Sequence, residues 1–168
     1  MHVSQSMQSW LVLGALCVPM LWAAWIDYRS YRIPNRITYP SMLCFVALNV
    51  ALAGLEGRWL EGLFVGGAGL LLAGGCMLPP FLLGVMGAGD VKLMAVSGAA
   101  LGPGAVLTVL VFTALAGGVQ AALTLGAHML RTGSMQNPPK VCYGVAIAVG
   151  TLGAAAWRAV GGKYIAVF

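Results

Sequence analysis

The sequence is poor in charge, and poorest in negative charge. Only 8% of its 168 residues are charged, nine Lys and Arg against four Asp and Glu, while 60% are hydrophobic and the mean hydropathy is +0.91. A soluble domain carries about 25% charged residues, so this chain has too few polar groups to cover its own surface in water. We therefore predict a polytopic membrane protein whose surroundings are largely the lipid bilayer.

Ligands for metals are scarce as well. The four cysteines form no Cys-x-x-Cys pair, which gives no support to a zinc ribbon or a redox motif, and they lie in apolar segments as small hydrophobic side chains would. The two histidines, His2 and His128, are isolated. We expect no metal and no other cofactor. The net charge of +5 is scattered rather than gathered in a basic block, so we expect no nucleic-acid partner.

The apolar runs are continuous rather than alternating, which predicts an all-α membrane protein and argues against a β-barrel. A helix needs about 20 apolar residues to cross a bilayer, and the runs divide into six expected transmembrane helices, of which the fourth is short. Because residues 1–10 contain no Lys or Arg, we interpret the first helix as retained rather than as a signal peptide. The expected helices are 8–26, 38–54, 62–84, 91–102, 104–126 and 141–160.

Proline and glycine mark the expected interruptions. Pro79-Pro80 should kink or end the third helix, and the Gly-Pro-Gly segment at 102–104 should separate the fourth from the fifth. Glycines also cluster at 66–69 and 117–118, where small residues let membrane helices approach closely, and we expect these to serve packing rather than chemistry.

The loops differ in charge, and this difference predicts their orientation. The first, third and fifth loops carry most of the basic residues and should face the cytoplasm, with the N-terminus outside. Arg158 and Lys163, in the C-terminal tail, weakly oppose this assignment. It places the chain's only two aspartates, Asp27 and Asp90, on the same, cytoplasmic side.

Each aspartate stands at the end of an apolar run. A carboxylate at the edge of the hydrocarbon is costly and is a candidate functional residue. Two such acids suggest the pair of an aspartic protease, in which one is protonated and the other ionised. The alternative for Asp27 is an ion pair with Arg29 or Arg32. The alternative for Asp90 is a helix N-cap.

The residues around the aspartates add detail. Two glycines before Asp90, Gly87 and Gly89, allow a positive φ and the close approach of another chain. Lys92 is either a surface anchor or a neighbour of the carboxylates. After Asp27, Pro34 can occupy the first turn of the next helix, and Asn35 can bond its own backbone in a turn.

These motifs resemble those of the type IV prepilin peptidases, bacterial inner-membrane aspartic proteases of the GxGD class. The resemblance covers roughly residues 20–150 and rests on Asp27 followed by Ile-Pro-Asn at 33–35, on Gly-Ala-Gly-Asp-Val-Lys-Leu at 87–93, and on Tyr-Gly-Val-Ala-Ile-Ala at 143–148. It implies that Asp27 and Asp90 are catalytic and that Gly87 and Gly89 are the motif glycines. It also implies cleavage of prepilin or pseudopilin leaders after a glycine, at the cytoplasmic face of the inner membrane.

The resemblance is to the short members of this family. Larger members carry an additional domain with paired Cys-x-x-Cys zinc ligands and a methyltransferase activity. This chain reads instead as a single peptidase domain over residues 1–168, with no methyltransferase domain, like the peptidases of Flp/Tad-type pili. Cys142 stands where the family often has proline.

A different class of function fits the same two carboxylates. A small ion or proton-coupled transporter could use Asp27 and Asp90 to bind a cation. Transporters usually place charged or polar groups near the membrane midplane. Here that region offers only amides and hydroxyls, such as Asn49, Thr108 and Gln120.

Overall fold

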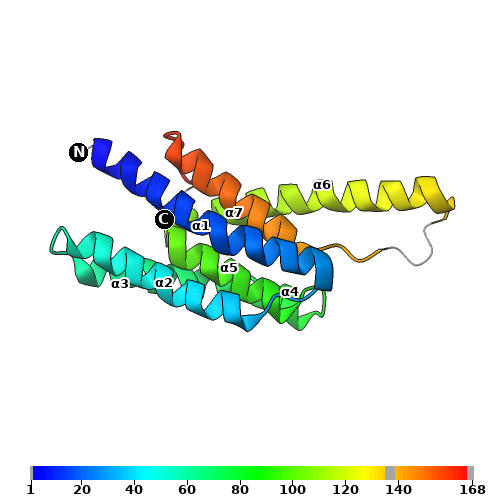
Figure 1. Cartoon of the computed structure of the whole chain (residues 1–168), viewed down its shortest axis with the longest axis horizontal. Helices are drawn as coiled ribbons and strands as arrows, with labels where there is room; N and C mark the ends of the chain where they lie inside the picture. Colours follow the sequence, from blue (N-terminus) through cyan, green and yellow to red (C-terminus); the bar gives the residue numbers. More distant parts are fainter. Residues whose placement is uncertain (1, 135–138, 166–168) are drawn as a thin grey trace.

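A computed structural model describes residues 2–134 and 139–165, with side chains from residue 7 onward. These residues form helices and no strand, and Figure 1 shows the long helices lying roughly along one another. The all-helical prediction is confirmed for the described part of the chain. The elements are α1 (His2–Ser30), α2 (Asn35–Gly54), α3 (Trp59–Cys76), α4 (Leu78–Leu82), α5 (Ala88–Leu101), the 3-10 turn η1 (Pro103–Ala105), α6 (Val106–Thr132) and α7 (Tyr143–Ala159).

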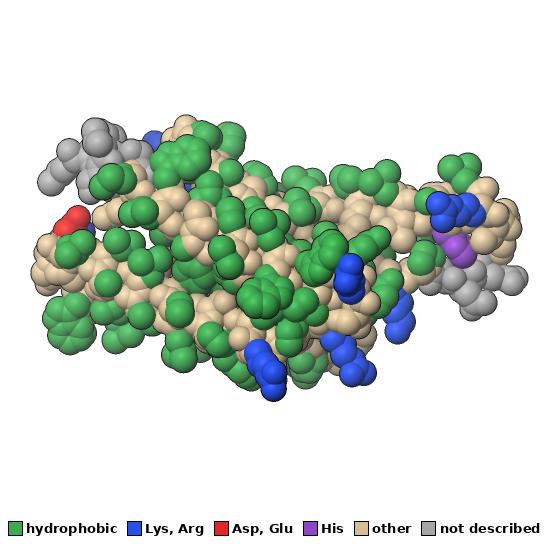
Figure 2. All heavy atoms as spheres, viewed as in Figure 1, with side chains coloured by type: hydrophobic (Ala, Val, Ile, Leu, Met, Phe, Trp, Pro, Cys, Tyr) green, Lys and Arg blue, Asp and Glu red, His purple; other side chains and the backbone are tan. Residues whose placement is uncertain are grey.

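Four helical segments are long and apolar enough to cross a membrane, in accord with a multi-pass membrane protein. They are Met7–Ser30, Asn35–Gly54, Trp59–Leu82 and Pro103–Thr132. Helices α5 and α7 have only 14 and 17 residues, so six complete crossings stay a prediction, as does the outside location of the N-terminus. Figure 2 shows hydrophobic side chains spread along the length of the molecule.

Both predicted interruptions are present. Helix α3 ends at Cys76, and α4, which contains Pro79 and Pro80, follows directly. Gly102 adopts φ 79°, where a Cβ would also lie 2.8 Å from Val65 Cγ1, so the chain turns there between α5 and α6. Helix α6 runs to Thr132, six residues past its expected end at 126, and projects beyond the other helices (Figure 1).

The helices pack in two groups. In the first, α5 packs against α3 and α2, and in the second, α7 packs against α1 and α6. Glycines bring the helices close within each group. A Cβ on Gly69 of α3 would lie 2.1 Å from the carbonyl oxygen of Gly98 of α5, and a Cβ on Gly150 of α7 would lie 2.4 Å from Thr113 Oγ1 of α6.

The packing role predicted for the clustered glycines is therefore confirmed only for part of each cluster. Gly66 and Gly69 face neighbouring helices, and a Cβ on Gly117 would lie at an ordinary contact distance, 3.5 Å, from Ala146 Cβ. A Cβ on Gly67 or Gly118 would meet nothing within 4 Å. Helical periodicity explains the difference, since adjacent residues point about 100° apart.

Helix α5 joins the two groups in the centre of the molecule. Its Leu93, Met94 and Val96 are buried to 1% exposure or less and belong to the main hydrophobic core. Ser97 Oγ of α5 lies 2.7 Å from Thr151 Oγ1 of α7, a hydrogen bond between two fully buried hydroxyls. Helix α5 therefore contacts both groups, and its first turn carries Asp90.

Candidate active site

Asp27 lies one turn before the end of α1. The helix ends there because Tyr31 adopts a positive φ of 52°, a left-handed conformation in which its N–H donates to the Asp27 carbonyl oxygen at 2.8 Å. The Asp27 side chain is only 5% exposed. Its Oδ2 accepts a hydrogen bond from the Gly144 N–H at 2.9 Å, at the start of α7. This contact joins residues 117 positions apart in the chain.

The alternative ion pair for Asp27 is not formed. Among the described residues, the ion pairs within 4 Å join Arg58 to Glu56 and Glu61. Arg29 instead lies over the Trp25 ring, 4.4 Å from its centroid. A buried carboxylate without a cationic partner depends on backbone N–H donors for stabilisation, and Gly144 supplies one.

Asp90 is the third residue of α5 and is 9% exposed. Its Oδ2 accepts a hydrogen bond from the Gly87 N–H at 3.0 Å. The interpretation of Asp90 as the N-cap itself is therefore wrong: Gly87 is the cap, and Asp90 reaches back to it from the third position, as in a capping box. The helix starts at Ala88 rather than at the expected residue 91.

The expectation of a positive φ at the two motif glycines is also wrong, and a close approach of another segment of the chain is present at Gly89 but not at Gly87. Gly87 has φ −81°, and Gly89 is not among the positive-φ residues. Gly89 instead faces Ile33, where an added Cβ would lie 3.0 Å from Ile33 Cβ and 3.4 Å from its backbone nitrogen. The absence of a side chain at Gly89 is what lets the segment after α1 pack against the start of α5.

The two aspartates come together at one end of the molecule. They interact electrostatically, although Asp27 belongs to the α1–α6–α7 group and Asp90 to the α2–α3–α5 group. Cys142 is buried and lies near both aspartates. Its burial, and then the negative charges of Asp27 and Asp90, raise the pKa of its thiol. The thiol therefore stays protonated at neutral pH and adds no negative charge beside the two acids.

Lys92 lies close to the segment that follows Asp27 in the chain. Its Nζ donates to Asn35 Oδ1 at 2.8 Å and lies 5.1 Å from the centroid of the Tyr39 ring. Asn35 thus accepts a hydrogen bond from a lysine of another helix rather than bonding its own turn as expected. Pro34, with φ −74°, immediately precedes α2 instead of occupying its first turn. All seven predicted site residues belong to the segments that meet at this end.

Two residues at this meeting point had no role assigned from the sequence. Gly144 holds Asp27, and Ile33 contacts both Gly89 and the neighbourhood of Gly144. A Cβ on Gly144 would lie 2.7 Å from Asp27 Oδ2 and 2.9 Å from Ile33 Cδ1. The available signal was the glycine at the start of the last helix, but its partner could not be identified without the tertiary structure.

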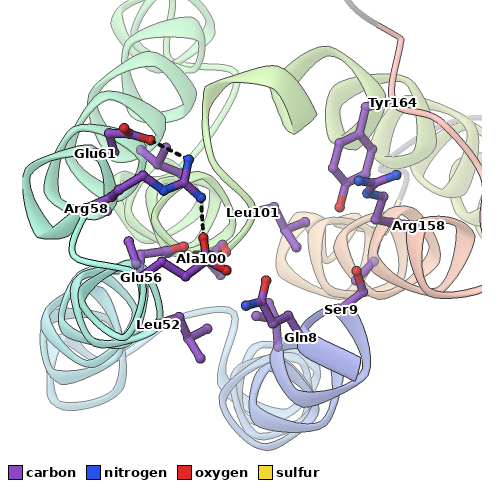
Figure 3. Close-up of a pocket in the computed structure, with 16 residues that line it drawn as sticks. Gln8, Ser9, Leu52, Glu56, Arg58, Glu61, Ala100, Leu101, Arg158 and Tyr164 are labelled. Atoms are coloured by element: carbon purple, nitrogen blue, oxygen red, sulfur yellow. Dashed lines mark hydrogen bonds and ion pairs between the residues drawn. The ribbon is translucent and has the colours of Figure 1, made fainter. Parts of the chain in front are cut away.

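A cavity of about 660 Å³ lies at the other end of the same helices. Figure 3 shows Arg58 between Glu56 and Glu61 on one side, with Arg158 and Tyr164 on the other. Its α5 lining residues are Ala100 and Leu101, at the opposite end of the helix from Asp90. Leu101 follows Asp90 by eleven positions, about 16 Å along a helix, so this cavity is distinct from the site of the two aspartates.

Comparison with known proteins assigns the family. No curated protein and no solved structure gives a match. The model of the type IV leader peptidase family matches residues 14–122, a range that holds Asp27 and Asp90, the C-terminal part of α1 and all of α5. The match covers well over half of the chain, and it agrees with the motifs around the two aspartates. The chain therefore belongs to the type IV leader peptidase family.

Proposed function

We propose that this leader peptidase is an aspartic endopeptidase and that Asp27 and Asp90 are its catalytic pair. The observation that carries the proposal is the convergence of the chain's only two aspartates, both at least 91% buried, from different helix groups. Neither has a cationic partner within 4 Å in the described structure. Isolated carboxylates in such a position are costly to fold, which favours a functional reason for their presence.

The chemistry follows from the sharing of one proton by two adjacent acids. The Gly144 N–H favours the ionised form of Asp27, so Asp27 takes a proton from the attacking water. Asp90 donates its proton to the carbonyl oxygen of the scissile peptide bond. The resulting tetrahedral diol collapses when the C–N bond breaks, and the nitrogen leaves with the proton that Asp27 had accepted. One diol proton returns to Asp90, which restores the starting state.

The proposed substrates are the leader peptides of prepilins or pseudopilins, of the Flp type, cut at the cytoplasmic face of the bacterial inner membrane. The charge distribution supports the orientation. Six of the nine basic residues belong to segments at the aspartate end, as the positive-inside rule requires of a cytoplasmic face. Figure 2 shows most of the visible Lys and Arg side chains toward that end, and the visible acidic atoms at the other end. The motif residues Pro34, Asn35, Gly87, Gly89 and Lys92 would support the site without taking part in proton transfer.

The cavity opposite the site bears on the transporter alternative. A transported ion would have to pass from this cavity to the aspartates along α5. The intervening part of α5 contains the buried Leu93, Met94 and Val96, and its Ser97 already bonds Thr151. These residues offer an ion no continuous row of ligands, which favours the peptidase.

The experiment is co-expression with a candidate Flp-type prepilin and detection of the shortened product on a gel. Asp27→Ala and Asp90→Ala should each abolish cleavage, and Asp27→Asn, which keeps the shape but cannot accept the proton, should do the same. Glu61→Ala is the matched control, because Glu61 is an exposed acid that pairs with Arg58 at the far end. Cleavage at the wild-type level in either alanine variant would exclude the proposed pair. Ion flux in liposomes that needs both aspartates, without proteolysis, would favour the transporter.

A further inference from the structure

The cavity at the end opposite the aspartates has two walls of opposite charge. On one wall, Arg58 pairs with both Glu56 and Glu61, which leaves one net negative charge. On the other wall, Arg158 of α7 faces the same space beside Tyr164 (Figure 3). A ligand with a cationic group at one end and an anionic group at the other complements both walls.

Arg158 has hydrogen-bond donors left for an anion. No described carboxylate lies within 4 Å of it, and its one hydrogen bond to a described residue goes to the Gly162 carbonyl oxygen, at the long distance of 3.5 Å. Burial raises the pKa of the neighbouring Tyr164 to about 12, so the Tyr164 hydroxyl stays protonated and can donate as well. An arginine fork matches the oxygens of a phosphate, and the hydroxyl adds a further donor.

Glu56 offers an acceptor to a cation on the opposite wall. Its Oε2 accepts a hydrogen bond from Arg58, which also bonds Glu61. Within the described structure no donor bonds the other oxygen, Oε1, and Figure 3 shows the Glu56 carboxylate pointing into the cavity. A primary ammonium can donate a hydrogen bond there, whereas a quaternary ammonium has no N–H group to donate.

Exposed tryptophans place this cavity at the depth of the lipid headgroups. Trp10, Trp59 and Trp157 each stand next in the chain to a residue that lines the cavity, and their exposed fractions are 53%, 55% and 49%. The other two tryptophans, Trp22 and Trp25, belong to the opposite half of α1, toward the aspartates. Tryptophan concentrates at both membrane–water interfaces, so the two sets match the two interfaces of one bilayer.

We propose that the cavity binds a phospholipid headgroup that carries a phosphate and a primary ammonium, with the phosphate at Arg158 and Tyr164 and the ammonium at Glu56. The cavity volume of about 660 Å³ lies within the range of small-ligand sites, about 300–1,000 Å³, so the headgroup enters while the acyl chains stay in the bilayer. The bound lipid bridges the two groups of helices, since Glu56 follows α2 and Arg158 belongs to α7. The inference is independent of the proposed function.

The test measures the binding of defined lipids to the full chain in a nonionic detergent, by native mass spectrometry. Phosphatidylethanolamine should bind about tenfold more tightly than phosphatidylcholine or phosphatidylglycerol with the same acyl chains, because a lost hydrogen bond to a charged group costs about tenfold or more in affinity. The choline headgroup has no N–H donor on its ammonium, and the glycerol headgroup has no cation. Phosphatidylethanolamine should also raise the thermal unfolding midpoint most.

Three variants and a control assign the contacts. Arg158→Gln should weaken the binding of phosphatidylethanolamine about tenfold. Tyr164→Phe, which keeps the ring, should weaken it by a smaller factor and decides the question if Arg158→Gln does not fold. Glu56→Gln should remove the preference for phosphatidylethanolamine over phosphatidylglycerol. Arg131→Gln is the matched control, because Arg131 also lies in the last turn of its helix, α6, but does not line the cavity.

Two results would overturn the proposal. One is equal binding of the three lipids by the wild type, and the other is binding of phosphatidylethanolamine that neither Arg158→Gln nor Tyr164→Phe weakens. Glycerophosphoethanolamine, the same headgroup without acyl chains, distinguishes a lipid from a soluble ligand. It should bind far more weakly than the lipid, and equal affinity would show that the site takes a soluble zwitterion instead. Asp27→Ala should bind the lipid like the wild type, so the outcome does not depend on whether the chain cuts leaders.

Discussion

Gly144→Ala is the most direct test of the site, because it adds one carbon where the structure has no room. The new Cβ would lie 2.7 Å from Asp27 Oδ2, 2.9 Å from Asp27 Cγ and 2.9 Å from Ile33 Cδ1. Comfortable contacts of carbon are about 3.5–4.0 Å. The Asp27 carboxylate therefore has to move, and the hydrogen bond that it accepts from the Gly144 N–H at 2.9 Å is stretched or lost.

The magnitudes separate activity from stability. A hydrogen bond to a charged group contributes about 1.5–3 kcal/mol. If the ionised Asp27 needs that bond to act as the base, kcat/KM should fall by about 10–100-fold. Overpacking costs about 1–3 kcal/mol in stability, but alanine is favoured over glycine inside a helix by about 1 kcal/mol. The lost hydrogen bond adds its own cost of about 1.5–3 kcal/mol in stability, so the net loss should be about 1.5–5 kcal/mol, and kcat/KM is therefore referred to the amount of folded protein.

The assay measures leader cleavage in detergent or liposomes together with the thermal unfolding midpoint of the same preparation. Gly118→Ala, on α6, is the control, because a Cβ at this position would meet nothing within 4 Å. It should leave cleavage unchanged and leave the unfolding midpoint unchanged or slightly raised. Two results would refute the reasoning: wild-type kcat/KM in Gly144→Ala, or an activity loss fully explained by a loss of folded protein.

Three further predictions concern other contacts. Lys92→Met and Asn35→Ala should each weaken cleavage modestly. The double variant should cleave no worse than the poorer single variant, because both substitutions remove the same 2.8 Å hydrogen bond. Additive losses of cleavage in a double-mutant cycle would contradict this. Gly98→Ala should prevent folding, because its Cβ would lie 2.1 Å from a backbone oxygen of α3. Gly67→Ala should fold like the wild type, because a Cβ on Gly67 would meet nothing within 4 Å. The yield of monodisperse protein after purification measures the folding of each variant. Cys142→Pro should keep cleavage within about threefold of the wild type, because residue 142 already has φ −83° outside the helix; loss of cleavage with normal folding would show that the thiol itself is needed.

Composition predicted the membrane environment, and the continuous apolar runs predicted the helical class. With so few charges, the interruptions in the apolar pattern identified the helix boundaries, and the breaks at Pro79-Pro80 and Gly102 were correctly placed. The end of α6 was missed because residues 127–132 include polar His128 and Arg131, which hydropathy counts against a membrane span. These residues are nevertheless compatible with a helix, so α6 continues to Thr132 and ends at Gly133, whose φ is 65°.

The aspartates were found from the sequence because an isolated acid in an apolar chain is rare, but their surroundings were not. The two glycines before Asp90 suggested positive φ, which is the commonest reason for a glycine in a turn. Here the cause is steric instead, since Ile33 lies against Gly89. That contact, and the hydrogen bond from Gly144 to Asp27, join segments far apart in the chain, and no local pattern encodes which segments will meet.

The arrangement of the helices also explains how a pair of carboxylates can be kept close without an ion pair. Each group of helices is held internally by glycine contacts, with Gly69 against Gly98 in one group and Gly150 against Thr113 in the other. Each group supplies one aspartate, and the contacts that join the groups include the Ser97–Thr151 hydrogen bond and the packing of Ile33. The repulsion between two carboxylates acts across this boundary, where it is opposed by tertiary packing rather than by the backbone of a single helix. The spacing of the two aspartates, on which the proposed sharing of one proton depends, is therefore a property of how the two groups dock.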